Sequence, residues 1–252
     1  MQIIHEDDNI IVCHKSAGIA TQSADLRSKD MVSLVKTHLV RQARKNKVRL
    51  TGEPYVGLIH RLDQPVEGIL VMAKDKESAA NLSKQVTDNK IEKYYYALVQ
   101  GTPDETKDHI SKKILEDGTV YIEDEIIKKS DGNAQIVTGI STDDLKTLGN
   151  PEDKKVSKLE YKLISSKDGN SLIEVHLITG RFHQIRATMS YLRCPIVGDT
   201  RYGAKEISDK EMLLDKAIAL CSYKLTFKHP VTGKELTFKI DPSEPMFNGF
   251  KE

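Results

Sequence analysis

The chain lacks the features that would place it in a membrane or outside the cell. No apolar run in its 252 residues approaches the length of about 18 residues that a membrane-spanning helix needs. The first eight residues contain no basic segment followed by an apolar one, so no signal peptide is predicted. The three cysteines, Cys13, Cys194 and Cys221, show no paired spacing, which indicates reduced thiols. Together these absences predict a cytoplasmic protein.

The chain also lacks a net charge that would favour or exclude a nucleic-acid partner, because its formal charge is only +1. The distribution of charge is uneven, however. Residues 36–49 contain no acid, whereas acids gather at 116–125 and 143–153. The basic residues of the first segment are Lys36, Arg41, Arg44, Lys45, Lys47 and Arg49. This segment is compatible with phosphate binding and equally with the solvated end of a helix.

Alternating apolar residues and turn signals predict a chain made mostly of strands. Hairpins are predicted at 3–12, 159–177 and 220–240, each with a polar turn between two apolar runs. Residues 102–157 are polar and acidic, and predict short strands and mobile loops. No linker divides the chain and no repeat appears.

Helices intervene irregularly between these strands. Asp30 and Asp75 are predicted N-caps, each followed by apolar residues at helical spacing. A third helix is predicted to begin near His183 and to stop at Cys194-Pro195. Strands with irregular helices predict an α+β fold built on a mostly antiparallel sheet.

Residues 57–68, Gly-Leu-Ile-His-Arg-Leu-Asp-Gln-Pro-Val-Glu-Gly, precede an apolar run that predicts a buried strand. Pro65 cannot donate to a sheet ladder, so His60, Arg61 and Asp63 are predicted to lie on a loop or bend. A carboxylate on a loop held by a rigid strand is a usual position for a reacting group. In isolation, a surface ion pair between Arg61 and Asp63 is the more common explanation for such a triplet.

Three other segments stand in order with this stretch. They are Glu-Lys-Tyr-Tyr-Tyr-Ala-Leu-Val-Gln-Gly at 92–101, Thr-Gly-Arg-Phe-His-Gln-Ile-Arg at 179–186, and Pro-Ile-Val-Gly-Asp at 195–199 with Tyr-Gly at 202–203. Together with Leu-Ile-His-Arg-Leu-Asp at 58–63, these segments resemble the RluA-type pseudouridine synthase family. The resemblance covers nearly the whole chain, from about residue 6 to residue 242.

The resemblance implies a pseudouridine-synthase-like fold, with one catalytic domain over residues 1–252 whose two halves share one sheet, and no N-terminal S4 domain. It implies an isomerase that converts uridines in structured ribosomal or transfer RNA to pseudouridine. This isomerisation transfers no electrons and carries no group, so no cofactor and no metal are expected. A monomer that does not associate with membranes is also expected.

The resemblance places three catalytic residues on this sequence: Asp63, Tyr95 and Arg186. The carboxylate of Asp63 would act near the sugar, either as nucleophile at C1′ or as base at C2′. A guanidinium beside it counters the effect of burial and keeps it charged. Tyr95 would stack on the uracil of a flipped nucleotide. Core packing and an exposed helix position are the alternatives for Tyr95 and Arg186.

A second set of residues is predicted to contact the RNA. Arg61 is suited to a position beside the one that the flipped uridine leaves. Contacts with the RNA backbone or sugars are expected from His60, Arg181, His183 and Gln184. Local hydrogen bonding that shapes the loop is an equally good explanation for each of them.

The sequence departs from the family pattern at several positions. Val66-Glu67 stands where Thr-Ser is usual, Lys15-Ser16 where Lys-Pro is usual, and Phe182 where Thr is common. These departures affect loop shape and substrate choice, while the three catalytic positions remain.

Three other functions are compatible with parts of the sequence. A glycosidase or nucleoside hydrolase could use Asp63 and Glu67 as a carboxylate pair, although Pro65 disfavours the helix that would bring them together. A metal site at His60, Asp63, His176 and His183 would match no familiar ligand spacing. An RNA-binding module without activity is the third alternative.

Overall fold

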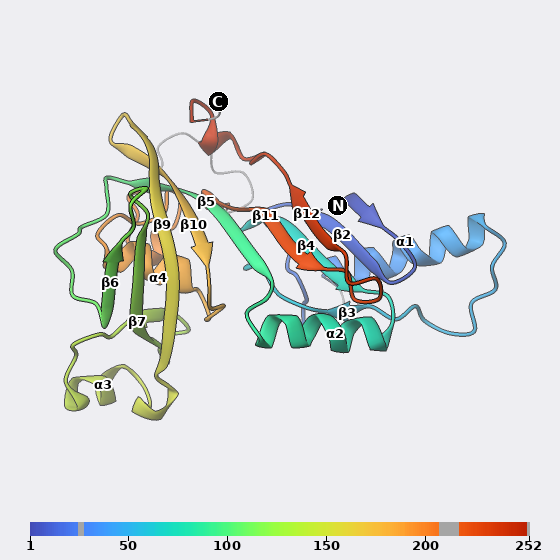
Figure 1. The fold of residues 1–252 in the computed structure, drawn as a ribbon, viewed down its shortest axis with the longest axis horizontal. Coiled ribbons are helices and arrows are strands. Elements are labelled where there is room, and N and C mark those ends of the chain that lie inside the picture. The colour runs from blue at the N-terminus through green and yellow to red at the C-terminus, as the bar shows by residue number, and fades with distance from the viewer. Residues whose placement is uncertain (25–27, 207–216, 251–252) are drawn as a thin grey trace. The chain divides into compact units, whose positions relative to one another are not determined.

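The computed structural model describes residues 1–24, 28–206 and 217–250 of the chain (Figure 1). Its elements are mainly antiparallel strands with four α-helices, and the predicted α+β class is confirmed. The chain divides into two compact units. The first consists of Met1–Glu92, Asp215–Ala217 and Ser222–Pro242, and the second of Lys93–Leu214, Ile218–Cys221 and Ser243–Glu252.

The first unit contains the predicted opening and closing hairpins. Its strands follow the order β1 (Gln2–Glu6), β2 (Ile10–Lys15), β4 (Glu67–Ala73) and β11 (Leu220–Lys228). The short β3 (Gly57–Leu58) pairs with β4, and β12 (Glu235–Lys239) pairs with β11. All seven residues of β4 are buried, and the strand lies between β2 and β11 in the strand order.

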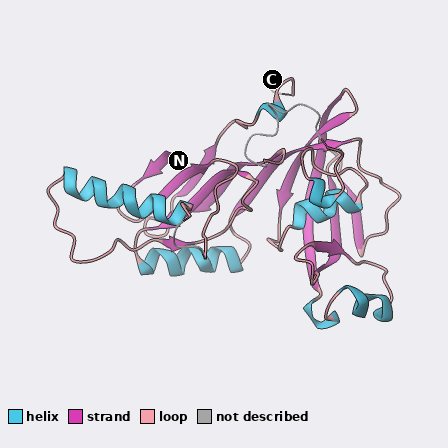
Figure 2. Ribbon diagram, turned by 180° about the vertical axis from the view of Figure 1, so that it is seen from behind, coloured by secondary structure: helices cyan, strands magenta, loops and turns pink. Residues whose placement is uncertain are grey.

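Two helices accompany this sheet, α1 (Met31–Lys45) and α2 (Lys76–Thr87). Both predicted N-caps are confirmed: Asp30 accepts a hydrogen bond of 2.7 Å from the Ser33 amide, and Asp75 accepts one of 2.7 Å from the Ser78 amide. Leu82 of α2 packs with alternate side chains of β2, β4 and β11. Helix α1 lies behind the strands in Figure 1 and in front of them in the reversed view of Figure 2.

The second unit is a meander-rich sheet. Its strands follow the order β5 (Glu92–Gln100), β10 (Asn170–Leu177), β9 (Lys155–Lys167), β7 (Val120–Lys128) and β6 (Ser111–Ile114), and β8 (Ala134–Ile136) pairs with β7. The predicted β9–β10 hairpin is confirmed, with Asp168 and Gly169 at positive φ in its turn. Helix α4 (Gln184–Tyr191) begins one residue after His183, as predicted. Short 3₁₀ turns occur at Pro151–Asp153, Thr200–Tyr202 and Pro245–Phe247.

The prediction of only short strands and loops over residues 102–157 was wrong for two segments. Strand β7 is nine residues long, and residues Thr142–Leu148 form the helix α3. In β7 the three acids at 123–125 are consecutive, and the middle one, Asp124, lies on the buried face and is paired with the His109 ring at 2.9 Å. The run of acids therefore concealed a strand whose buried face is apolar except for Asp124. Helix α3 is short, and Leu145 anchors it against Ile127.

All three cysteines are buried and none forms a disulfide bond. Burial raises the pKa of both the Cys13 and the Cys194 thiols to about 12. In the ranges that the structure describes, no helix has the length and apolar character needed to cross a bilayer.

Candidate functional site

The Asp63 loop, residues 59–66, joins β3 to β4 in the first unit. Pro65 lies within it, so the predicted bend is confirmed. Just beyond the last β3 residue, the His60 Nε2 atom accepts a hydrogen bond of 3.3 Å from the Val71 amide of β4, which extends the attachment of the loop to the buried strand. Asp63 is partly buried and Arg61 is exposed.

Both neighbours of Asp63 are anchored to the segment that follows β2. Thr21 Oγ1 donates to the Leu62 carbonyl at 2.7 Å and accepts from the Leu62 amide at 3.1 Å. The Gln64 carbonyl accepts from the Gly18 amide at 2.9 Å and from the Lys15 ammonium at 3.1 Å. The backbone on each side of Asp63 is therefore fixed by at least two hydrogen bonds.

Lys15 is completely buried, which is rare for a lysine. Its ammonium donates to the carbonyls of Ser16 and Gln64, each at 3.1 Å. In the sequence, Lys15 stands out only as part of a Lys-Ser pair that departs from the family pattern. Carbonyl partners for a buried ammonium are not readable from sequence, because they depend on how two loops meet.

The entrance to β4 is very tightly packed. Gly68 has φ +142°, and a Cβ at that position would lie 2.5 Å from the Ser222 Cβ atom and 2.6 Å from the Ser222 amide nitrogen. Glu67, one residue earlier, is completely buried and lies 3.3 Å from the His14 ring. A carboxylate in this position has no exposed surface with which to meet a substrate.

Tyr95 lies on β5 in the second unit and is 5 % exposed. Neighbouring Tyr94 and Tyr96 are partly buried, and Tyr94 stacks on the His176 ring with centroids 4.4 Å apart. The alternation of a strand thus separates Tyr95 from the other two tyrosines. Lys93, two residues before Tyr95, is also buried, and burial lowers the pKa of its ammonium.

Arg186 lies in the first turns of α4 and is 5 % exposed, so it is not an exposed helix arginine. Its guanidinium pairs bidentately with Asp199: Nε donates to Oδ2 at 2.7 Å and Nη2 donates to Oδ1 at 2.9 Å. The guanidinium carbon also lies 4.7 Å from the centroid of the Tyr202 ring. Burial raises the pKa of the Tyr202 phenol. The geometry holds the guanidinium in one orientation.

His183 links the loop before α4 to the same cluster. Arg186 Nη1 lies 3.2 Å from His183 Nε2, and an arginine can only donate, so Nε2 accepts this bond. The ring proton of a neutral His183 therefore sits on Nδ1, which lies 2.8 Å from the Tyr202 hydroxyl. His183 adopts φ 50°, a left-handed conformation that is uncommon for histidine. The contacts with Arg186 and Tyr202, together with a stack on the Phe182 ring with centroids 3.7 Å apart, hold His183 in this conformation.

Arg181 and Gln184 occupy different environments in the same segment. Arg181 is exposed and is held by a hydrogen bond of 2.8 Å from its Nε atom to the Val156 carbonyl. Gln184 is buried; its Oε1 accepts from Thr179 Oγ1 and from the Arg181 amide, and its Nε2 donates to the Lys158 carbonyl. Gln184 thus shapes the loop that presents Arg181.

The structure brings Arg181, His183, Gln184 and Arg186 together in the second unit, while His60, Arg61 and Asp63 share one loop of the first. Sequence reasoning missed the roles of Asp199 and Tyr202. Both lie in the fourth segment that carried the resemblance, and this position was the one signal that could have indicated them. Among the described residues, no group of three or more His, Cys, Asp or Glu could hold a metal ion.

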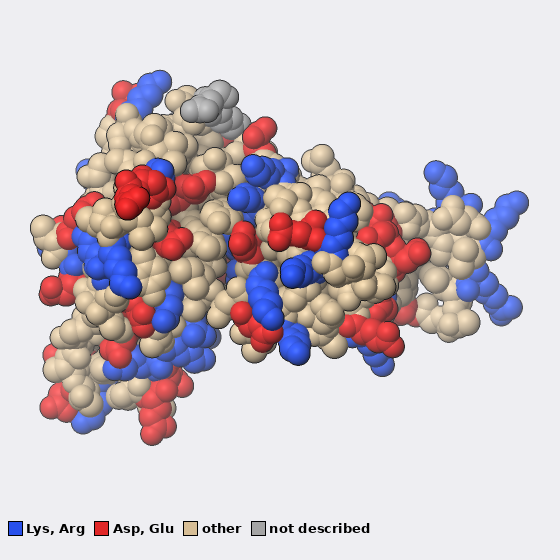
Figure 3. Space-filling model, viewed as in Figure 1, with Lys and Arg blue, Asp and Glu red and all other residues tan. Residues whose placement is uncertain are grey.

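The basic segment at residues 36–49 covers the end of α1 and the turn after it. Lys36 pairs with Glu53 at 3.1 Å, whereas Arg41 and residues 45–49 are exposed. Figure 3 shows Lys and Arg side chains gathered around this end of α1.

A family model described as RNA pseudouridylate synthase matches residues 9–191. The ribosomal large subunit pseudouridine synthase C of Rickettsia bellii is 32 % identical over 238 residues, covering 94 % of this chain and 67 % of that protein. The corresponding synthase D of Zymomonas mobilis is 29 % identical over 254 residues, covering 100 % and 72 %. This chain spans about two thirds of the length of such Rickettsia relatives.

Solved structures with the same fold include two human proteins. Human RNA pseudouridylate synthase domain containing 4 superposes with a TM-score of 0.70 at 23 % identity, covering 96 % of this chain and 89 % of that one. Human RNA pseudouridylate synthase domain containing 1 gives a TM-score of 0.63 at 21 % identity, covering 96 % and 83 %. These two similarities establish the fold.

Proposed function

The chain belongs to the RNA pseudouridylate synthase family, and from this we propose that it isomerises specific uridines of ribosomal RNA to pseudouridine. Family membership makes the enzyme an isomerase. The relatives are named for the ribosomal large subunit, which favours ribosomal RNA as the substrate. Transfer RNA is the second candidate. The observation that carries the proposal is the match of the family model over residues 9–191, which includes Asp63, Tyr95 and Arg186. The enzyme acts as a cytoplasmic monomer without a cofactor.

The reaction breaks the C1′–N1 bond of uridine and joins C1′ to C5 of the same base, while the C5 proton is lost and N1 gains one. Asp63 acts at the sugar, as nucleophile on C1′ or as base at C2′. The hydrogen bonds to Leu62 and Gln64 on either side support this role, because a reacting carboxylate needs a fixed backbone.

Arg186 keeps the Asp63 carboxylate charged during the reaction. A guanidinium has five N–H donors, so it can hold both Asp199 and a second carboxylate. Asp199, His183 and the Tyr202 ring fix its orientation in advance, which favours charge stabilisation without reorganisation. A buried, pre-oriented arginine supports this role better than an exposed one would.

The target uridine leaves its stack before Asp63 reaches C1′, and Tyr95 stacks on the extruded uracil. Loss of stacking costs a few kcal/mol, which contacts at the vacated position must offset. Exposed Arg61, two residues before Asp63, is suited to that position. Exposed Arg181 contacts the RNA backbone, and His60, His183 and Gln184 act by shaping the loops that carry these arginines.

Hydrolysis by Asp63 and Glu67 is disfavoured, because the Glu67 side chain is completely buried at the start of β4. The products also distinguish the two reactions. A hydrolase releases free uracil, whereas a synthase leaves a carbon-linked isomer in the RNA chain.

Comparison of pseudouridine positions in RNA from strains with and without this gene tests the function. We expect at least one ribosomal RNA position to lose pseudouridine in the deletion strain. Purified protein added to that RNA should restore it, and Asp63→Ala should bind the RNA but restore nothing. Asp143→Asn, whose side chain is 91 % exposed, provides the control and should restore the modification. An unchanged modification map, or restoration by Asp63→Ala, would contradict the proposal.

A further inference from the structure

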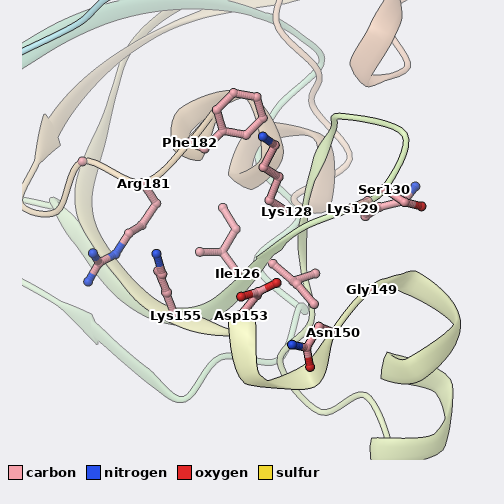
Figure 4. Close-up of a pocket in the computed structure, with 12 residues that line it drawn as sticks. Ile126, Lys128, Lys129, Ser130, Gly149, Asn150, Asp153, Lys155, Arg181 and Phe182 are labelled. Atoms are coloured by element: carbon pink, nitrogen blue, oxygen red, sulfur yellow. The ribbon is translucent and has the colours of Figure 1, made fainter.

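A basic pocket lies in the second unit beside the loop that leads into α4 (Figure 4). Its volume is about 570 Å³, within the range of small-ligand sites. The wall and floor come from the end of β7, the start of β9, the turn before it and the loop at 180–182. The residues used below are Ile126, Lys128, Asp153, Lys155, Arg181 and Phe182.

Cations dominate the lining of this pocket. The lining contains four cationic residues and a single carboxylate, that of Asp153. The four cationic residues are Lys128, Lys129, Lys155 and Arg181. Lys129 is paired with Asp131 outside the pocket at 2.9 Å. Arg181 is anchored through Nε to the Val156 carbonyl, which leaves the outer part of an exposed guanidinium turned to solvent. This charge distribution favours an anion with several negative oxygens.

An exposed aromatic ring stands beside these cations. Phe182 is 44 % exposed, and its ring stacks on His183 with centroids 3.7 Å apart. Because His183 is itself bound to Tyr202 and Arg186, the stack fixes the plane of the Phe182 ring. The Lys128 ammonium lies over the ring, 4.9 Å from its centroid, in a cation–π contact. Its flexible side chain can swing from the ring to a phosphate when a base stacks there. Ile126, 3 % exposed, adds an apolar floor.

An unpaired nucleotide binds well where a rigid aromatic face and an apolar floor meet its base and cations surround its phosphates. The base stacks on the ring and the phosphates meet the lysines and arginine, without a demand for base identity. A free anion would not need the ring, and an apolar ligand would not need the cations.

We propose that this pocket binds an unpaired nucleotide of the substrate RNA, separate from the target uridine. The base lies on Phe182, and its flanking phosphates lie against Lys128, Lys155 and Arg181. This inference rests on the proposed function for the identity of the ligand. Phe182 is one of the positions at which this sequence departs from the family pattern given above.

Fluorescence anisotropy with a labelled eight-nucleotide oligouridylate, measured between 50 and 200 mM salt, tests the pocket. The double variant Lys128→Ala/Lys155→Ala should weaken binding about 10-fold and reduce the slope of log K against log salt by about 1.4, or 0.7 for each lost phosphate contact. Lys113→Ala/Lys167→Ala removes the same charge from exposed positions outside the pocket and is the matched control.

Three further variants separate a binding role from a loss of folding. Phe182→Leu should weaken binding about 5-fold or more, and Phe182→Tyr should restore it, because only the ring is needed. Asp153→Asn removes the single pocket carboxylate and should tighten binding, which damage to the fold would not do. Equal affinities and salt slopes for the pocket variants and the control would overturn the inference.

Turnover on RNA from the deletion strain distinguishes this inference from the proposed function. If the wild-type protein forms pseudouridine and the pocket variants show an unchanged KM, the inference alone fails. If the wild-type protein forms none while oligouridylate binding still depends on Phe182 and the two lysines, the proposed function fails and the pocket stands as an RNA site.

Discussion

The buried ion pair between Arg186 and Asp199 allows a quantitative test of how the second unit holds its arginine in place. Both side chains are at most 5 % exposed, and two hydrogen bonds of 2.7 and 2.9 Å join them. Removing one partner of such a pair leaves a charge buried, which typically costs about 3–5 kcal/mol. We expect Asp199→Ala to lower the free energy of unfolding by about 3 kcal/mol, a large part of the stability of an ordinary domain.

A double-mutant cycle isolates the pair from the other contacts of Arg186. Urea unfolding of Asp199→Ala, Arg186→Met and the double variant should give an interaction energy of at least about 2 kcal/mol, because the double variant leaves no buried charge behind. Asp199→Asn should destabilise less, since the amide oxygen still accepts one hydrogen bond, yet it should lower turnover by loosening the guanidinium.

The exposed pair of Lys146 and Asp143 is the control for this cycle. Its side chains are 63 % and 91 % exposed, so Asp143→Ala should change the free energy of unfolding by less than about 0.5 kcal/mol. Additive effects of Asp199→Ala and Arg186→Met, each below about 1 kcal/mol, would refute the reasoning that the pair fixes this part of the site.

Two predictions concern the first unit. Gly68→Ala should cost about 3 kcal/mol or more, seen as a lower Tm, because its Cβ would overlap Ser222 and its φ is +142°; Gly52→Ala, with nothing within 4 Å, should change Tm little. Burial raises the pKa of Asp7, but hydrogen bonds from two backbone amides and two histidines outweigh this and lower it to about 2. The stability that this carboxylate contributes is therefore complete above about pH 4 and is lost as the pH falls toward about 2. Asp7→Asn should lower the free energy of unfolding by about 1 kcal/mol at neutral pH, allowing for solvent screening of a side chain 32 % exposed. It should also weaken the pH dependence of that free energy between about pH 4 and 2, whereas Asp8→Asn, at an exposed position, should not.

Local sequence signals predicted the elements whose structure depends on near neighbours. Asp30 and Asp75 cap helices because each side chain reaches an amide three residues away. Strand β7 and helix α3 were missed for the opposite reason. The acidic residues of β7 are satisfied by distant partners, such as His109 for Asp124, and such pairing is not visible in composition.

The residues of the candidate site likewise include some that local motifs indicate and some whose role depends on distant contacts. The motifs were sufficient to single out Asp63, Tyr95 and Arg186, and these assignments stay predictions. Asp199 and Lys15 went unrecognised, because their importance lies in contacts with residues 13 and 49 positions away. A short motif records which side chains are present, whereas the supporting hydrogen bonds arise only after folding.

The deep placement of the three thiols offers a practical advantage. Since Cys13, Cys194 and Cys221 are buried, maleimide dyes should not react with them in the folded enzyme. A single new cysteine on an exposed residue could then carry a fluorophore without prior removal of the native sulfur atoms. A dye on Lys113→Cys would report RNA docking on the second unit, and a dye on Arg41→Cys would report it on the first.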